Sequence, residues 1–355
     1  MARVGLALSA LESRPFSDLL EAATAADDAG FELIAVPEAW GREAFALLGY
    51  LAARTTRVRL ATGIVNVYSR TPALIAMAAA TLDELSDGRA VLGLGVSGAR
   101  VVEGFHGEPM ARPLRRLREV TEAVRAVLRG DAQGYAGEIV RVAPGFALRF
   151  ARASAAVPIY HASLTPAGIS QCGEIADGWF PFLHSRDALA RDLEYIHEGL
   201  RRAGRPRADF TVAPFVPVLV DDDLRAARDA VRGHVAFYVG AMGRFYYETL
   251  SRHGFGVVVE AVRREWQAGR REAALRAIPD EMVDAIAVCG PTERVRARFD
   301  ELRTAGADIP LAFLPMRATL AQTRRTIAAL ANVTSRRDGR APSLRAGRTD
   351  RDRSR

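Results

Sequence analysis

Short apolar segments alternate with longer segments of helical periodicity along almost the whole chain. Several apolar segments have no polar position at all, as expected of strands that are covered on both faces. The predicted strands are residues 4–8, 32–37, 58–65, 89–95, 157–162, 178–182, 211–219 and 310–314. The predicted helices are residues 19–29, 43–53, 73–85, 113–129, 166–177, 186–203, 222–277 and 319–331. Eight such units predict an α/β fold, a (β/α)8 or TIM barrel with insertions. A doubly wound open sheet is the alternative, because counting units does not exclude it.

Local signals mark helix starts and two insertions. Asp18 begins a capping-box pattern for the first helix. Thr71 precedes a proline, so we expect a side-chain cap there, with the proline at the first helical position. Turn residues within 131–152 predict a hairpin insertion. The stretch 240–290 predicts extra helices between the seventh and eighth strands.

The positive charge of the chain is concentrated at its C-terminal end. The 355 residues carry a net charge of +7, and all 49 basic residues are arginine. Residues 333–355 hold eight arginines and three aspartates, a net charge of +5, which leaves +2 for residues 1–332. We therefore expect one domain over 1–332 and a disordered Arg-rich tail over 333–355. Because the barrel itself is not basic, a nucleic-acid partner is not expected.

Other classes of protein are disfavoured by composition and spacing. The longest charge-free stretch, 153–173, contains two prolines and a histidine, so we expect no membrane span. The two cysteines suggest no disulfide framework, and with no signal-peptide pattern they predict a cytoplasmic protein. The two cysteines and six histidines show no zinc-ligand spacing, so no metal site is expected.

In a barrel of this kind the active site lies at the C-terminal ends of the strands. The second predicted strand delivers Glu38, a candidate acid or base, and Trp40, a candidate wall for a flat ligand. The third strand carries Gly63, which suggests a bulge or a close approach of backbone to a ligand. Asn66 follows it with a polar group at the same end.

The fourth and fifth strands lead into loops with little side-chain bulk. Gly93, Gly95 and Gly98 match G-x-G-x-x-G, but glycines and Pro109 interrupt the following segment, which argues against a dinucleotide-binding fold. A loop whose backbone amides line a ligand cavity remains the interpretation, with Glu103 as a titratable group nearby. The segment 162–166 places small residues before a helix N-terminus, a suitable site for a phosphate.

Several long segments together resemble one family, the luciferase-like oxidoreductases of the coenzyme F420-dependent branch. In style the chain is similar to methylenetetrahydromethanopterin reductase, and the resemblance covers roughly residues 3–331. The segments that carry it are 36–45, 56–73, 78–89, 93–98, 173–179 and 278–284.

The resemblance implies a TIM barrel with a deazaflavin at its C-terminal mouth and a non-prolyl cis peptide between Gly63 and Ile64. The reaction implied is hydride transfer between C5 of coenzyme F420 and a small-molecule substrate, with Glu38 or Glu103 supplying or accepting the proton. The implied cofactor-binding residues are Trp40, Thr62, Gly63, Ile64, Asn66, Gly95, Val96, Ser97, Gly98, Ala162, Ser163, Thr165 and Gly178. Such barrels often pair, so a homodimer is possible.

Two departures from the family pattern bear on the cofactor. Thr165 stands where the family usually has a glycine before the proline, and the segment after 240–243 is shortened. An FMN-dependent luciferase-like monooxygenase is therefore the alternative function. A relative without catalysis is the third possibility, although a lost site would not need the glycines at 63, 95 and 98.

Overall fold

A computed structural model describes residues 3–8, 14–150, 153–154 and 156–331. Its main sheet consists of short strands, all paired in parallel. They are β1 (Gly5–Ala7), β2 (Leu33–Val36), β3 (Arg59–Thr62), β4 (Val65–Asn66), β5 (Ala90–Gly95), β8 (Ile159–Ala162), β9 (Gly178–Trp179), β10 (Thr211–Val212), β11 (Phe215–Val220), β12 (Val288–Gly290) and β13 (Leu311–Phe313). Their order is β10-β9-β8-β5-β3-β2-β1-β13-β11-β12, and β4 pairs with β5.

One segment of chain closes this sheet into a barrel. β10 pairs with β9 at one end of the sheet, and β11 pairs with β13 at the other. Only Ala213 and Pro214 separate β10 from β11, so the same segment belongs to both ends. A parallel bridge between Phe182 and Phe215 joins them again. The predicted barrel is confirmed, and the open doubly wound sheet is excluded.

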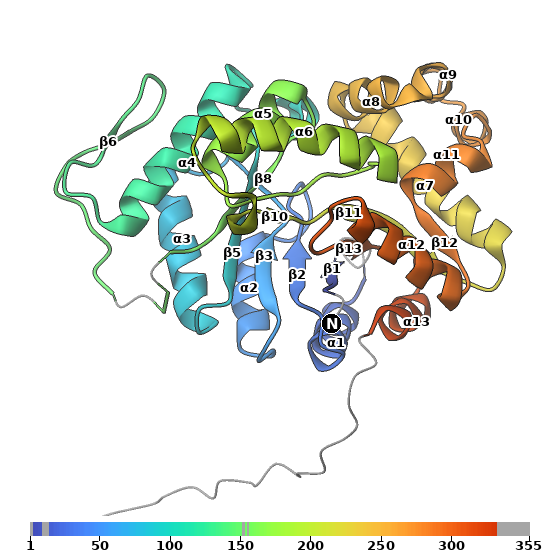
Figure 1. Ribbon diagram of the computed structural model, residues 1–355, viewed down its shortest axis with the longest axis horizontal. Coiled ribbons are helices and arrows are strands. Elements are labelled where there is room, and N and C mark those ends of the chain that lie inside the picture. The colour runs from blue at the N-terminus through green and yellow to red at the C-terminus, as the bar shows by residue number, and fades with distance from the viewer. Residues whose placement is uncertain (1–2, 9–13, 151–152, 155, 332–355) are drawn as a thin grey trace, which may run out of the picture.

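Helices pack around the outside of the strands (Figure 1). Those that follow the barrel strands are α1 (Phe16–Asp28), α2 (Ala44–Ala52), α3 (Pro72–Leu85), α4 (Pro113–Arg129), α5 (Pro166–Ile175), α6 (Arg186–Arg202), α7 (Leu224–Ala241) and α13 (Leu320–Leu330). The cap predicted at Thr71 is confirmed, because its side chain accepts a hydrogen bond from the backbone N–H of Leu74. Helix α1, in contrast, begins before its predicted start. Asp18 lies in its first turn, where a carboxylate favours the helix dipole, and Pro15 occupies the N-cap position.

The two insertions lie where the sequence predicts them. β6 (Tyr135–Ala136) and β7 (Arg141–Val142) form the antiparallel hairpin. The buried carboxylate of Glu119 in α4 holds the hairpin by accepting hydrogen bonds from the backbone N–H groups of residues 138–140.

The helical stretch predicted over 222–277 is confirmed, and it is divided into several helices. It consists of α7, α8 (Arg244–Leu250), a π-helical turn (Ser251–Phe255), α9 (Gly256–Gln267) and α10 (Arg271–Arg276). The breaks include Gly243 and Gly254, whose φ angles of 94° and 98° are incompatible with a right-handed helix. The extra helices predicted within 240–290 include α11 (Asp280–Ile286), but the sequence missed β12 and α12 (Thr292–Thr304). β12 has only three residues, too few to show any periodicity.

Small and large side chains share the barrel interior. Strands β1, β2 and β3 contribute the small Ala7, Ala35 and Ala61. Four large aromatic residues belong to the same cluster: Tyr160, Phe180, Phe215 and Phe313. Phe313 in β13 is the register partner of Ala7 in β1, so a ring lies beside a small side chain there.

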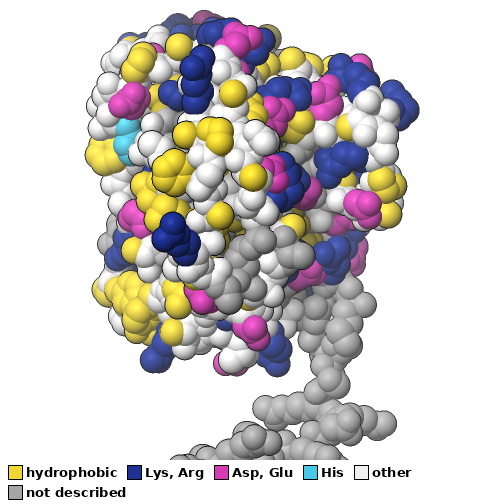
Figure 2. Space-filling view, turned by 90° about the vertical axis from the view of Figure 1, so that its left-hand side faces the viewer, with side chains coloured by type: hydrophobic (Ala, Val, Ile, Leu, Met, Phe, Trp, Pro, Cys, Tyr) yellow, Lys and Arg dark blue, Asp and Glu magenta, His cyan; other side chains and the backbone are white. Residues whose placement is uncertain are grey.

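Charge on the described surface is mixed. Figure 2 shows arginine and acidic side chains interspersed over the face it presents, with apolar side chains between them. In the described part of the chain, no helix is both long and apolar enough to cross a membrane. The predicted Arg-rich tail at 333–355 lies outside the described residues.

Candidate active site

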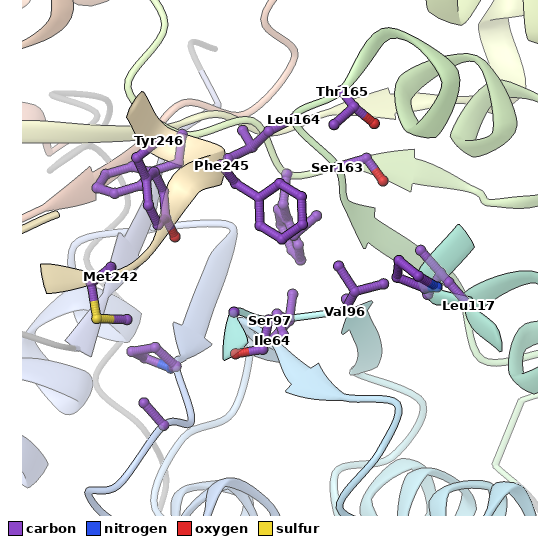
Figure 3. A pocket seen from close by; sticks show the side chains of 18 of the residues that line it. Ile64, Val96, Ser97, Leu117, Ser163, Leu164, Thr165, Met242, Phe245 and Tyr246 are labelled. Carbon is purple, nitrogen blue, oxygen red and sulfur yellow. The ribbon is translucent and has the colours of Figure 1, made fainter. Parts of the chain in front are cut away.

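A cavity of about 350 Å³ opens at the C-terminal ends of the barrel strands. Its wall includes ten of the residues predicted for the site: Glu38, Gly63, Ile64, Gly95, Val96, Ser97, Gly98, Ala162, Ser163 and Thr165. They come from loops after β2, β3, β5 and β8, far apart in the sequence. Figure 3 shows Ile64, Val96 and Ser97 on one side of the cavity and Phe245 and Tyr246 on the other. Five predicted residues, Trp40, Thr62, Asn66, Glu103 and Gly178, lie outside this wall.

The floor of the cavity at the end of β3 is made of backbone. The peptide bond between Gly63 and Ile64 is cis, as the family resemblance implies. A Cβ atom on Gly63 would lie 2.9 Å from the Cβ of Ala35 and 3.0 Å from a ring carbon of Phe215. A Cβ atom on Gly95 would lie 3.1 Å from the side chain of Ile64. Glycine at both positions therefore lets the backbone of these loops pack closely against its neighbours.

Thr62 and Asn66 hold this floor from behind. The hydroxyl of Thr62 donates to the carbonyl of Gly93 and accepts from its N–H, both at 2.8 Å. The Asn66 carbonyl oxygen accepts from the N–H groups of Tyr68 and Ser69, at 3.0 and 2.8 Å. Both side chains are buried. In this structure they fix the bulge on either side of the cis peptide.

The loop after β5 continues the backbone surface. Ser97 adopts the left-handed conformation, with a φ of 57°. A Cβ atom on Gly98 would lie 3.0 Å from the carbonyl oxygen of Met242. The glycine pattern then leads into a π-helical turn (Arg100–Phe105) rather than a long helix, which agrees with the argument against a dinucleotide fingerprint.

The loop after β8 leads into the N-terminus of α5. Thr165 is the N-cap residue, and its hydroxyl accepts from the N–H of Gly168 at 3.2 Å. The carbonyl of Ser163 accepts from the indole of Trp179 at 2.8 Å. The threonine that departs from the family pattern thus has a local role in starting the helix. Gly178, in β9, lies behind this loop, where a Cβ would collide with the ring of Tyr160.

Glu38 lies in the cavity wall with both carboxylate oxygens occupied. Arg70 donates to them at 2.5 and 2.8 Å, and the N–H of Ala44 donates at 2.9 Å. The hydrogen bonds from Arg70 to Glu38 raise the pKa of the guanidinium. Only 8% of the Glu38 side chain is exposed, so this is a buried charge pair that anchors the loop after β2.

Glu103 and Trp40 lie at the rim. Glu103 is exposed on the π-helical turn, and its carboxylate accepts from the N–H of Met110 at 3.3 Å. Trp40 is half-exposed, with the guanidinium of Arg100 5.1 Å from its ring centroid. Neither side chain contributes to the inner wall of the cavity.

Another part of the wall is aromatic and comes from the segment after β9, from α7 and from α8 in the chain's helical insertion. The rings of Phe182 and Tyr238 are 4.7 Å apart between centroids, and those of Tyr238 and Tyr246 are 5.0 Å apart. Burial raises the pKa of Tyr246 to about 12, so its hydroxyl carries a proton at neutral pH. His234 packs behind Tyr238, and burial lowers its pKa to about 3, so it is neutral.

A family model described as luciferase-like monooxygenase matches residues 1–308. The chain belongs to the luciferase-like monooxygenase family. It is 36% identical, over 86% of its length and 92% of the relative's, to a Mycobacterium tuberculosis protein named as a coenzyme F420-dependent oxidoreductase. It is 32% identical to the 5,10-methylenetetrahydromethanopterin reductase of Archaeoglobus fulgidus, over 82% of this chain and 87% of that one.

The fold of this luciferase-like enzyme agrees with that of a solved relative. The coenzyme F420-dependent tetrahydromethanopterin reductase of Methanopyrus kandleri superimposes with a TM-score of 0.81. The match covers 93% of this chain and 98% of that chain, at 23% sequence identity. This comparison supports the barrel architecture.

Sequence reasoning about this luciferase-like enzyme missed the aromatic wall. The predicted strand 178–182 ends at Phe182, and the helical stretch predicted over 222–277 contains Tyr238, but nothing in the local pattern assigns either residue to the cavity. The available signal was the run 244–247, Arg-Phe-Tyr-Tyr, directly after the helix break at Gly243. A break followed by adjacent aromatic residues would have indicated that this insertion turns back over the barrel.

Proposed function

We propose that this enzyme is a coenzyme F420-dependent oxidoreductase that transfers a hydride between C5 of the deazaflavin and a small organic substrate. The observation that carries the proposal is the backbone surface at Gly63, Gly95 and Gly98, which faces aromatic side chains across a cavity at the C-terminal ends of the barrel strands. The named F420-dependent relative at 36% identity supports the choice of cofactor.

The residues of the cavity fit a flat tricyclic ring. Side chains are absent at Gly63, Gly95 and Gly98, where Cβ atoms would fill the floor or meet the opposite wall. Ile64 and Val96 would contact the face of the ring, and the exposed backbone amides of the β5 loop would meet its polar edge. The cavity is thus formed as a cradle before any ligand enters.

The loop after β8 would hold the phosphate of the cofactor. Ser163 and Thr165 line the cavity next to the first turn of α5, where the positive end of the helix dipole favours an anion. Arg244, also in the wall, adds a positive charge at the same mouth. These groups would orient the cofactor by its tail, while the backbone floor positions its ring.

When bound, the deazaflavin supplies a two-electron donor or acceptor at its C5. The protein then has to hold the substrate carbon about 3–3.5 Å away and exclude water. Phe182, Tyr238 and Phe245 line the side opposite the floor, and their rings would press an uncharged part of the substrate toward the floor. This arrangement would supply both orientation and a dry site.

A proton must accompany the hydride when a carbonyl or similar group is reduced. The roles of Glu38 and Glu103 stay predictions. Glu38 already accepts three hydrogen bonds, and Glu103 lies outside the wall. We propose Tyr246 as the group that holds the proton, because its hydroxyl is protonated and it lines the cavity.

We also propose that the enzyme is located in the cytoplasm and forms a homodimer. Cys172 and Cys289 are both buried and free, which suits a reducing compartment. Sedimentation equilibrium of the purified chain tests the dimer, and a monomer at micromolar concentration would refute it.

The first experiment is a fluorescence titration of the purified protein with F420, run in parallel with FMN. We expect saturable binding of F420 at micromolar concentration and much weaker binding of FMN. Preference for FMN would favour the luciferase-like monooxygenase alternative, which uses oxygen. Binding of neither would favour a relative without catalysis.

A further inference from the structure

Beside the aromatic wall, but outside the cavity, three buried side chains come together from separate elements. His184 follows β9, Asp192 lies in α6, and His253 lies in the π-helical turn after α8. The Nε2 atoms of both histidines are 3.1 Å from the same Asp192 oxygen, Oδ2. All three ligand atoms lie within 4.8 Å of one another.

The hydrogen bonds of His184 show that a positive centre is needed between its ring and Asp192. Its Nδ1 lies 3.1 Å from the carbonyl oxygen of Phe182, which can only accept, so the ring proton belongs on Nδ1. In a neutral ring the lone pair of Nε2 then faces a carboxylate oxygen, which also only accepts. Either a second proton or a metal ion has to separate these two atoms.

The same arrangement is characteristic of histidines that ligate metals. A ligating histidine usually donates its other N–H to a backbone carbonyl or a carboxylate, which sets the tautomer and the ring orientation. The carbonyl of Phe182 performs this role for His184.

The three side chains are buried, and each offers one ligand atom toward the same point. Two imidazole nitrogens and one carboxylate oxygen form a donor set that zinc-type ions prefer.

We propose that His184, Asp192 and His253 bind one divalent transition-metal ion of the zinc type. Tetrahedral zinc with N and O ligands has ligand–ligand separations of about 3.3 Å. The two Nε2–Oδ2 distances of 3.1 Å are close to this value. The three side chains leave the fourth position to water.

Arg252 is compatible with this site. Its guanidinium donates to the same Asp192 oxygen, Oδ2, at 3.0 Å and to the carbonyl of Leu164 at 2.8 Å. A carboxylate oxygen has two lone pairs, so Oδ2 can ligate a metal with one and accept the hydrogen bond from Arg252 with the other. Arg252 would then orient the ligating carboxylate from outside.

The metal would brace two parts of the cavity wall at once. His184 is tied to the carbonyl of Phe182, and the segment that carries His253 is tied through Thr249 and Arg252 to the carbonyl of Leu164. Phe182 and Leu164 both line the cavity. The site is therefore structural, and its function is to fix the helical insertion against β8 and β9.

The experiment uses the full chain, stripped with a chelator and titrated with ZnSO4 by calorimetry and with CoCl2 by visible absorption. We expect one ion per chain, a cobalt spectrum typical of tetrahedral coordination, and a higher melting temperature with metal. Asp192→Asn and His253→Gln should each weaken zinc binding at least tenfold. His197→Gln, which removes an exposed histidine near Glu194 on the same helix, should bind zinc like the unmodified chain.

Zinc binding by the unmodified chain that is no tighter than in Asp192→Asn and His253→Gln would overturn the proposal. Circular dichroism of each variant checks that it is folded. If neither variant folds, ¹⁵N NMR of His184 in the unmodified chain decides the question. A metal-bound Nε2 in the presence of zinc supports the site, whereas a ring protonated on both nitrogens under the same conditions refutes it.

Discussion

The two sides of the cavity differ in what they present to a ligand: backbone on one side and aromatic side chains on the other. One side consists of short loops directly after β3, β5 and β8, where glycines expose backbone and residues such as Thr62 support it from behind. The other side consists of aromatic side chains from β9 and the helical insertion. The first surface is flat and polar at its edge, whereas the second is apolar and shaped by ring packing.

The difference suggests a division of labour. Backbone held by strand pairing keeps its shape through most side-chain changes, so it suits a cofactor whose shape is constant. Rings on an insertion can be exchanged without disturbing the barrel, so they suit a substrate that differs between relatives. The two sides meet where Gly98 approaches the carbonyl of Met242 and where Arg100 donates to the carbonyl of Ala241 at 3.4 Å.

The largest effect is expected at the floor. Gly63→Val places methyl groups where even a Cβ lies 2.9 Å from Ala35, so the bulge must move. We expect F420 binding to weaken about a hundredfold, roughly 2.7 kcal/mol, because overpacking shifts backbone and not only a side chain. Fluorescence titration measures the change. Gly233→Ala is the control, since a Cβ there has no neighbour within 4 Å; normal binding by a folded Gly63→Val protein would refute the backbone argument.

Glu38→Gln should lower the free energy of unfolding and the turnover rate more than it lowers the affinity for F420. The change leaves Arg70 without its buried charge partner, and we expect a loss of about 2 kcal/mol in the free energy of unfolding by urea denaturation. Glu43→Gln is the matched control, because Glu43 pairs with the same arginine but its side chain is 46% exposed. This variant should lose less than about 1 kcal/mol in the free energy of unfolding. Equal losses in the two variants would contradict the buried-pair interpretation.

Tyr246→Phe tests the aromatic side. We expect turnover to fall about tenfold, near 1.4 kcal/mol, while the dissociation constant of F420 stays within about twofold. Because burial raises the pKa of Tyr246 to about 12, the donor stays protonated, and the rate should not decline as the pH rises from 6 to 10. Tyr247→Phe is the control, since its hydroxyl bonds Glu260 outside the cavity. A rate that declines above about pH 5 would point to a carboxylate instead.

The smallest effect is expected for Thr165→Gly. The loss of the cap on α5 should cost a few tenths of a kcal/mol, since glycine is itself tolerated at N-caps. With the side chain removed, backbone can approach the cofactor phosphate, and we expect F420 to bind about threefold tighter, roughly 0.65 kcal/mol. Thr165→Ser, which keeps the hydroxyl, is the comparison. Weaker binding by Thr165→Gly alone would show that the hydroxyl itself binds the cofactor.

The sequence by itself determined the alternation of strands and helices and the loops that form the backbone side of the cavity. Both follow from short-range signals: apolar strands, a proline-started helix at Thr71, and glycines at 63, 95 and 98. Strand pairing then brings the ends of parallel strands to one rim, so a strand-end residue can be placed without knowing its neighbours.

Only the tertiary structure decided the rest. The aromatic side depends on how the insertion turns at Gly243, and that direction is set by packing of rings far apart in the chain. The bidentate pairing of Glu38 with Arg70 and the meeting of His184 with His253 join residues 32 and 69 positions apart. No local periodicity encodes such contacts, because the free energy that forms them comes from burial across elements and not from the conformational preferences of either segment.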